Sequence, residues 1–241
     1  MNSLSSRLVA HRGYMEAYPE NSWRGIQAAL DLGATWVEFD IQMYAPGRFV
    51  LLHDMDFNRT ASRPLSLLEI TEQQLEQISI HEPLRLGGEH GPEPVPWLHE
   101  VLPHLADYPA ARVMVEIKEE SLHHWGVAPV MQSLLAILDR FSTQCVLISF
   151  SYAALNFARE NSNLEIGWVL RQYDQFNIDR ASVLKPEYLI CNHTKLPKTN
   201  QLASGPWIWM IYDITDATLA RHWIGRGIDL IETRDIGKLI A

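Results

Sequence analysis

A small set of polar residues with complementary chemistry recurs at the ends of short apolar runs in this chain. The set is His11, Arg12, Glu38, Asp40, His53, Glu116 and Lys118. Histidines move protons near neutral pH, carboxylate oxygens hold hard divalent cations, and guanidinium and ammonium groups offset phosphate charge. Together these residue types predict metal-assisted cleavage of a phosphoester bond.

The three carboxylates Glu38, Asp40 and Glu116 are the candidate metal ligands. Because side chains alternate along a strand, Glu38 and Asp40 point the same way, as do Glu116 and Lys118. A single Glu-x-Asp pair usually forms surface salt bridges, but three carboxylates at predicted strand ends beside histidines favour a metal site. An oxygen ligand set without thiolates suits Mg²⁺ or Ca²⁺ better than zinc.

His11 and His53 are the candidate catalytic acid and base. One would take a proton from a nucleophile and the other would give one to the leaving alkoxide. The other eight histidines are expected to be surface or packing residues. Asp54 is expected to point away from its neighbour His53 and receives no catalytic role. Asn21 is either the N-cap of the first helix or part of the site.

Eight short apolar runs must position these side chains, with helical patterns between most of them. The runs are 7–10, 36–40, 113–117, 146–149, 166–170, 188–191, 208–212 and 230–233, and the helical patterns include 22–32, 127–141, 152–160 and 217–224. Such alternation in a chain of 241 residues predicts a TIM barrel, with a doubly wound open sheet as the alternative. In a barrel the carboxyl ends of all strands share one face, so the polar set converges there.

Residues 55–97 interrupt the alternation. This segment is rich in Pro and Gly and holds one predicted short helix near 71–78, while 48–52 before it resembles an extra strand. We expect a small insertion after the second barrel strand, on the catalytic face, where it would shape the substrate pocket.

Bulk composition favours one enzymatic domain over 1–241, and two smaller domains are the alternative. The net charge of −9 and the lack of Lys/Arg clusters argue against a nucleic-acid binder or an anionic-membrane anchor. Residues 1–6 lack signal-peptide features and no run has the length of a membrane span, so we expect a cytoplasmic protein. Cys145 and Cys191 are predicted to be buried thiols. The oligomeric state stays open, with a homo-oligomer as one alternative.

The ordered motifs resemble those of the glycerophosphodiester phosphodiesterases of the cytoplasmic bacterial type. They are A-H-R-G at 10–13, P-E-N-S at 19–22, E-F-D at 38–40, L-L-H-D at 51–54, N-R-T at 58–60 and E-I-K at 116–118, with weaker echoes at 95–102 and 227–233. The resemblance implies a TIM barrel with a small insertion. It also implies a divalent metal on the three carboxylates, an acid/base pair at His11 and His53, and phosphate contacts from Arg12 and Lys118.

The activity that this resemblance implies is hydrolysis of glycerophosphodiesters, such as glycerophosphocholine or glycerophosphoethanolamine, in lipid and glycerol metabolism. A glycerol hydroxyl would attack first to give a cyclic phosphate, which water would open. The products would be sn-glycerol 3-phosphate and the free alcohol.

Two departures from the family pattern bear on substrate preference. Where the family has W-T-V-N, this chain has residues 209–212, with Tyr212 in place of the Asn. Trp209 is a candidate substrate-binding residue that would stack on the glycerol or alcohol part, and a core or rim aromatic is an equal alternative. The family's T-D-x-P is replaced at 233–236, which concerns a helix start.

Two other functions compete with the hydrolase. A barrel of this kind could bind a phosphoester without turning it over, but a binder has no need of two strand-end histidines. Lys118 could instead act as a Schiff-base lysine. With Glu116 two residues away on the same face, that lysine should stay protonated and be a poor nucleophile.

Overall fold

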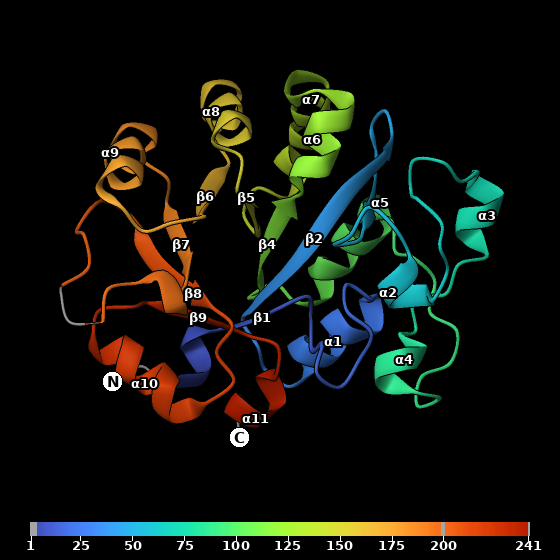
Figure 1. The fold of residues 1–241 in the computed structure, drawn as a ribbon, viewed down its shortest axis with the longest axis horizontal. Coiled ribbons are helices and arrows are strands. Elements are labelled where there is room, and N and C mark those ends of the chain that lie inside the picture. The colour runs from blue at the N-terminus through green and yellow to red at the C-terminus, as the bar shows by residue number, and fades with distance from the viewer. Residues whose placement is uncertain (1–3, 199–200, 241) are drawn as a thin grey trace.

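Eight parallel strands close into a barrel that is surrounded by helices (Figure 1). The computed structural model describes residues 4–198 and 201–240. Strand β1 (Leu8–Ala10) pairs with both β2 (Trp36–Ala45) and β9 (Leu230–Thr233), which closes the sheet on itself. The ring is completed by β4 (Arg112–Ile117), β5 (Cys145–Ser149), β6 (Glu165–Leu170), β7 (Tyr188–Asn192) and β8 (Ile208–Tyr212). The predicted TIM barrel is confirmed, and the open sheet is wrong.

Alternation along the strands divides the apolar side chains into two layers. One layer fills the barrel and comprises Val9, Met114, Val146, Ile148, Val169, Tyr188, Ile190, Met210 and Leu230. The other lies between the strands and the surrounding helices. Charged side chains on inward positions can therefore avoid the apolar filling only near the barrel mouth, at the strand ends.

Helices follow most of the barrel strands. They are α1 (Trp23–Asp31), α6 (Glu119–Trp125), α7 (Val127–Leu138), α8 (Tyr152–Asn161), α9 (Gln175–Leu184), α10 (Ala217–Gly225) and α11 (Ile236–Ile240). Short 3₁₀ turns are η1 (Leu4–Arg7), η2 (Leu102–Asp107), η3 (Asp139–Phe141) and η4 (His193–Lys195). The sequence pattern did not single out α9, because it buries only Ile178, Ala181 and Leu184 among polar residues.

The N-cap of helix α1 lies one residue later than predicted. Ser22, not Asn21, caps it, since the Ser22 side chain accepts a hydrogen bond from the Gly25 backbone N–H. Asn21 has a left-handed backbone with φ of 54°, whereas a capping residue is extended. The capping alternative for Asn21 is therefore wrong.

The segment after β2 leaves the barrel and builds a small layer at its side (Figure 1). Strand β3 (Arg48–Leu51) pairs antiparallel with β2. The helices α2 (Asn58–Ala61), α3 (Glu72–Glu76), α4 (Pro83–Leu86) and α5 (Leu98–Val101) follow. Residues of 50–95 share an apolar cluster of their own. The single-domain organisation over 1–241 stays a prediction.

Two further expectations concern the termini and the thiols. Cys145 and Cys191 are free and buried, as predicted. Within the described residues, no helix has the length and apolar character needed to cross a membrane. Of the N-terminal segment 1–6, residues 1–3 lie outside the described part of the chain.

Candidate active site

Seven of the eight predicted site residues line one cavity of about 180 Å³ at the carboxyl ends of the strands. They are His11, Arg12, Glu38, Asp40, His53, Glu116 and Lys118. His11 and Arg12 follow β1, the first two carboxylates lie in β2, and Glu116 lies in β4. Parallel pairing places Asp40 directly beside Glu116. The barrel thus brings residues that are far apart in the sequence close together in space.

Arg12 is held at the centre of the site by carboxylates. Its backbone has a left-handed φ of 51°, and its N–H donates to Glu38 Oε2 at 3.0 Å. The guanidinium places Nε 3.0 Å from Asp40 Oδ2 and donates from Nη1 to Glu20 Oε1 at 3.0 Å. The turn depends on Gly13, because a Cβ there would lie 2.6 Å from α1 backbone atoms. The Arg12 guanidinium is therefore held in position before any ligand binds.

Asp40 is ionised and rigidly oriented. The Asn21 amide donates to Asp40 Oδ2 at 3.0 Å, and its oxygen accepts from the Asp40 backbone N–H at 3.0 Å. Burial opposes ionisation, but Arg12 and Lys118 hold the pKa of Asp40 well below its usual range. Asn21 thus belongs to the site as the residue that positions Asp40.

Lys118 lies between two carboxylates. Its Nζ donates to Glu116 Oε1 at 2.7 Å and lies 3.3 Å from Asp40 Oδ1. Despite burial, Asp40 and Glu116 raise the pKa of Lys118 above its usual value. A lysine kept protonated in this way can contact phosphate but is a poor amine nucleophile.

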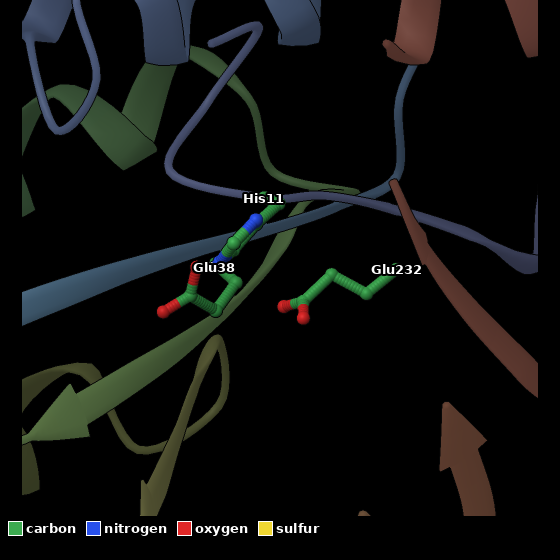
Figure 2. Close-up of side chains that lie close together, drawn as sticks. All are labelled: His11, Glu38 and Glu232. Carbon is green, nitrogen blue, oxygen red and sulfur yellow. Dashed lines mark ion pairs between the residues drawn. The ribbon is translucent and has the colours of Figure 1, made fainter. Parts of the chain in front are cut away.

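Sequence reasoning missed Glu232, which extends from β9 into the same cavity. Figure 2 shows the Glu232 carboxylate directed toward His11 and Glu38, and ligand atoms of these three residues lie within 4.8 Å of one another. The signal was present in the sequence, since Glu232 is a carboxylate near the end of the eighth predicted strand, like Glu38 in the second.

The buried carboxylates repel one another. Burial and the neighbouring charges of Asp40 and Glu232 raise the pKa of Glu38 well above its usual value. Burial and Glu116 raise the pKa of Glu232 in the same way. Among the described residues, none donates a hydrogen bond to the buried Oε1 of Glu38. An unpartnered oxygen beside ionisable carboxylates marks a position for a cation.

The three predicted metal ligands fit a divalent ion. Oxygens of Glu38, Asp40 and Glu116 lie within 4.8 Å of one another, and all three residues are buried. The set offers only oxygens, which suits hard cations such as Mg²⁺ or Ca²⁺. Glu38 also belongs to the second group, with His11 and Glu232.

His53 approaches the cavity from the loop after β3 and is oriented by Asp54. Its Nδ1 bonds Asp54 Oδ1 at 2.7 Å, and Arg59 Nε donates to Asp54 Oδ2 at 2.8 Å. The hydrogen bond from His53 lowers the pKa of Asp54 to about 2. The expectation that Asp54 points away was wrong, because β3 ends at Leu51 and strand alternation no longer applies.

Trp209 does not reach the cavity. Its ring is buried outside the barrel with Trp207 and Tyr173, and its Nε1 donates to the Ala203 carbonyl at 2.9 Å. The inward positions of β8 are Met210 and Tyr212, which line the cavity instead. The substrate-stacking role predicted for Trp209 is therefore corrected to a packing role.

Known sequences similar to this chain are phosphodiesterases. The sequence model described as "Glycerophosphoryl diester phosphodiesterase family" matches residues 11–195. A glycerophosphodiester phosphodiesterase of Caldanaerobacter subterraneus subsp. tengcongensis is 25% identical over 166 residues, which cover 68% of this chain and 66% of that protein. One from Bacillus altitudinis is 29% identical over 122 residues, which cover 51% of this chain and 49% of that protein. The matches thus span about half to two thirds of these relatives.

Solved structures share the fold. An Oleispira antarctica phosphodiesterase, in complex with the product sn-glycerol-3-phosphate, superposes with a TM-score of 0.85 at 21% identity, covering 99% of this chain and 98% of that one. A putative glycerophosphoryl diester phosphodiesterase from Silicibacter pomeroyi gives 0.81 at 19% identity, covering 97% and 91%. Because the family sequence model spans well over half of the chain and includes every residue of the predicted acid/base pair and metal set, this chain belongs to the glycerophosphoryl diester phosphodiesterase family.

Proposed function

We propose that this protein hydrolyses glycerophosphodiesters, such as glycerophosphocholine or glycerophosphoethanolamine, to sn-glycerol 3-phosphate and an alcohol. The observation that carries the proposal is the gathering of two histidines, five carboxylates, Arg12 and Lys118 around one cavity. Family membership supports the reaction, and the product held by the Oleispira antarctica relative supports the glycerol phosphate half. We place the enzyme in lipid and glycerol metabolism in the cytoplasm.

The phosphate would bind between Arg12 and Lys118. Both cations are already charged and held by Asp40, at 3.0 Å and 3.3 Å, so little ordering is needed when the substrate arrives. When bound to Glu38, Asp40 and Glu116, Mg²⁺ or Ca²⁺ would withdraw negative charge from the phosphoryl oxygens as the P–O bond breaks.

His11 would act as the base in the first step. Burial and the adjacent Arg12 lower the pKa of His11 well below its usual value, so the ring is neutral and can accept a proton. It would take the proton of a glycerol hydroxyl, whose oxygen then bonds to phosphorus.

His53 would act as the acid in the same step. Asp54 holds its Nδ1, which leaves Nε2 for the substrate. The bond from phosphorus to the alcohol breaks, His53 gives its proton to the departing alkoxide, and a cyclic phosphate remains. In the second step the roles reverse: His53 takes a proton from water, whose oxygen bonds to phosphorus, and His11 returns its proton to the glycerol oxygen.

A binding-only barrel is the contrasting hypothesis, and one experiment separates the two. The purified protein is incubated with glycerophosphocholine and glycerophosphoethanolamine in EDTA, Mg²⁺ or Ca²⁺, and sn-glycerol 3-phosphate is measured. The proposal predicts cation-dependent release that EDTA abolishes. Tight binding of the diester with no product under either cation would replace it with the binding-only hypothesis.

A further inference from the structure

We propose that Glu232 is a specificity-determining residue that accepts hydrogen bonds from the hydroxyls of the substrate's glycerol part. The inference rests on the proposed function and extends it to a residue that neither the motifs nor the comparisons assign. Glu232 is 5% exposed, and its carboxylate makes no hydrogen bond or ion pair within the described part of the chain.

A buried carboxylate is costly unless something bonds it, so the cavity must receive a group that does. Glu232 lines the cavity and is directed to the space beside His11 and Glu38 (Figure 2). A cation is one such group and a hydrogen-bond donor on the substrate is the other.

The candidate cation groups favour the donor. Glu38, Asp40 and Glu116 already form one ligand set for a divalent cation. A cation at Glu232 would have to share Glu38 with that set and take His11 as a ligand, although the proposed reaction needs the His11 ring as a base. A hydrogen-bond donor on the substrate is therefore the group that we assign to Glu232.

The position of Glu232 identifies which part of the substrate it meets. A carboxylate repels phosphate oxygens, so the phosphate lies toward Arg12 and Lys118 and a neutral part lies at Glu232. The proposed reaction places a glycerol hydroxyl at His11, and Glu232 lies within 4.8 Å of the same imidazole. The cavity lining also includes the apolar side chains of Ile148, Val169, Ile190 and Met210, which suit the carbon skeleton.

The test compares two ligands that differ only in hydroxyls. Binding of sn-glycerol 3-phosphate and of n-propyl phosphate is measured by calorimetry with saturating Mg²⁺, in the wild type, Glu232→Ala and Glu232→Asp. The control is Glu100→Gln, an exposed glutamate of α5 outside the cavity. Thermal unfolding of each variant establishes that it is folded, and Mn²⁺ binding alone is measured in parallel.

We expect the wild type and Glu100→Gln to prefer the glycerol ligand by at least about tenfold, because a site built for hydroxyls rejects an analogue that lacks them. In Glu232→Ala the preference should fall to within about threefold of unity, with n-propyl phosphate bound as well as before or better. Glu232→Asp, with its carboxylate withdrawn by one methylene, should lose most of the preference. The affinity for Mn²⁺ should be unchanged in Glu232→Ala and in Glu232→Asp.

Three results would overturn the inference. One is an unchanged preference in Glu232→Ala, and another is an equal loss of affinity for both ligands. The third is a fall in Mn²⁺ affinity, which would make Glu232 a cation ligand. If the wild type releases sn-glycerol 3-phosphate from the diester but shows one of these results, only this inference fails. A wild type that binds neither ligand and releases no product refutes the proposed function as well.

Discussion

Replacing Asp54 by alanine should slow turnover chiefly because it releases the His53 imidazole. The imidazole Nδ1 bonds Asp54 Oδ1 at 2.7 Å, so the substitution removes the group that fixes the ring. A hydrogen bond with a charged partner contributes about 1.5–3 kcal/mol. Both side chains are about one third exposed, at 32% and 31%, so solvent screens their interaction. We therefore expect the loss of this hydrogen bond to cost about 1.5–2 kcal/mol. That corresponds to roughly a 10- to 30-fold fall in kcat.

The assay is a double-mutant cycle on glycerophosphocholine hydrolysis with saturating cation. His53→Ala alone should cost about 100- to 10,000-fold, because it removes the proton transfer itself. In that background Asp54→Ala should cost almost nothing more, since its effect passes through the missing imidazole. Asp56→Asn serves as the control, because Asp56 lies in the same loop but bonds the Asn58 backbone N–H. A full Asp54→Ala loss that persists without His53 would refute the reasoning.

Three further predictions concern support of the site. Asn21→Ala removes two hydrogen bonds from buried Asp40 and should lower the free energy of unfolding by about 1–3 kcal/mol in urea titrations, with weaker Mn²⁺ binding; unchanged values in both would contradict the positioning role. Because burial and neighbouring carboxylates raise the pKa of Glu38 and Glu232, these two groups contribute stability to the metal-free fold that is fully present below the ordinary glutamate pKa and is lost as pH rises through the raised values. A divalent cation bound to Glu38 would displace the proton of that residue. The rise in Tm that added Mg²⁺ causes should therefore grow from about pH 5 to about pH 8 in calorimetry, and a constant rise would count against the linkage. Trp209→Phe should lower stability by about 1–2 kcal/mol while KM stays within about twofold, because the indole packs outside the cavity; a large KM change in steady-state kinetics would restore its substrate role.

The strand-end rule explains why most of the site could be predicted. Charged side chains at the carboxyl ends of parallel strands must face the barrel mouth, which predicts that Glu38, Asp40 and Glu116 lie together. The same rule applies to Glu232, although its motif is only a weak echo of the family pattern.

Other features could not be read from the residues. Strand β8 is apolar on both faces, so its sequence does not say whether Trp209 or Tyr212 faces inward. The contact between His53 and Asp54 depends on where β3 ends, and Asn21 meets Asp40 through a left-handed backbone that pattern reasoning assigns to a helix cap. Each of these features depends on the backbone geometry at the end of a helix or strand, where local sequence signals are weakest.

The proposed hydrolysis of glycerophosphodiesters depends most directly on His11. The most direct measurement is glycerophosphocholine turnover followed by ³¹P NMR with saturating cation, in the wild type, His11→Ala and His222→Ala. His222 is an exposed histidine of α10 and serves as the matched control. We expect a fall in kcat/KM of about 100- to 10,000-fold for His11→Ala and none for the control. Equal turnover in the wild type and His11→Ala would contradict it.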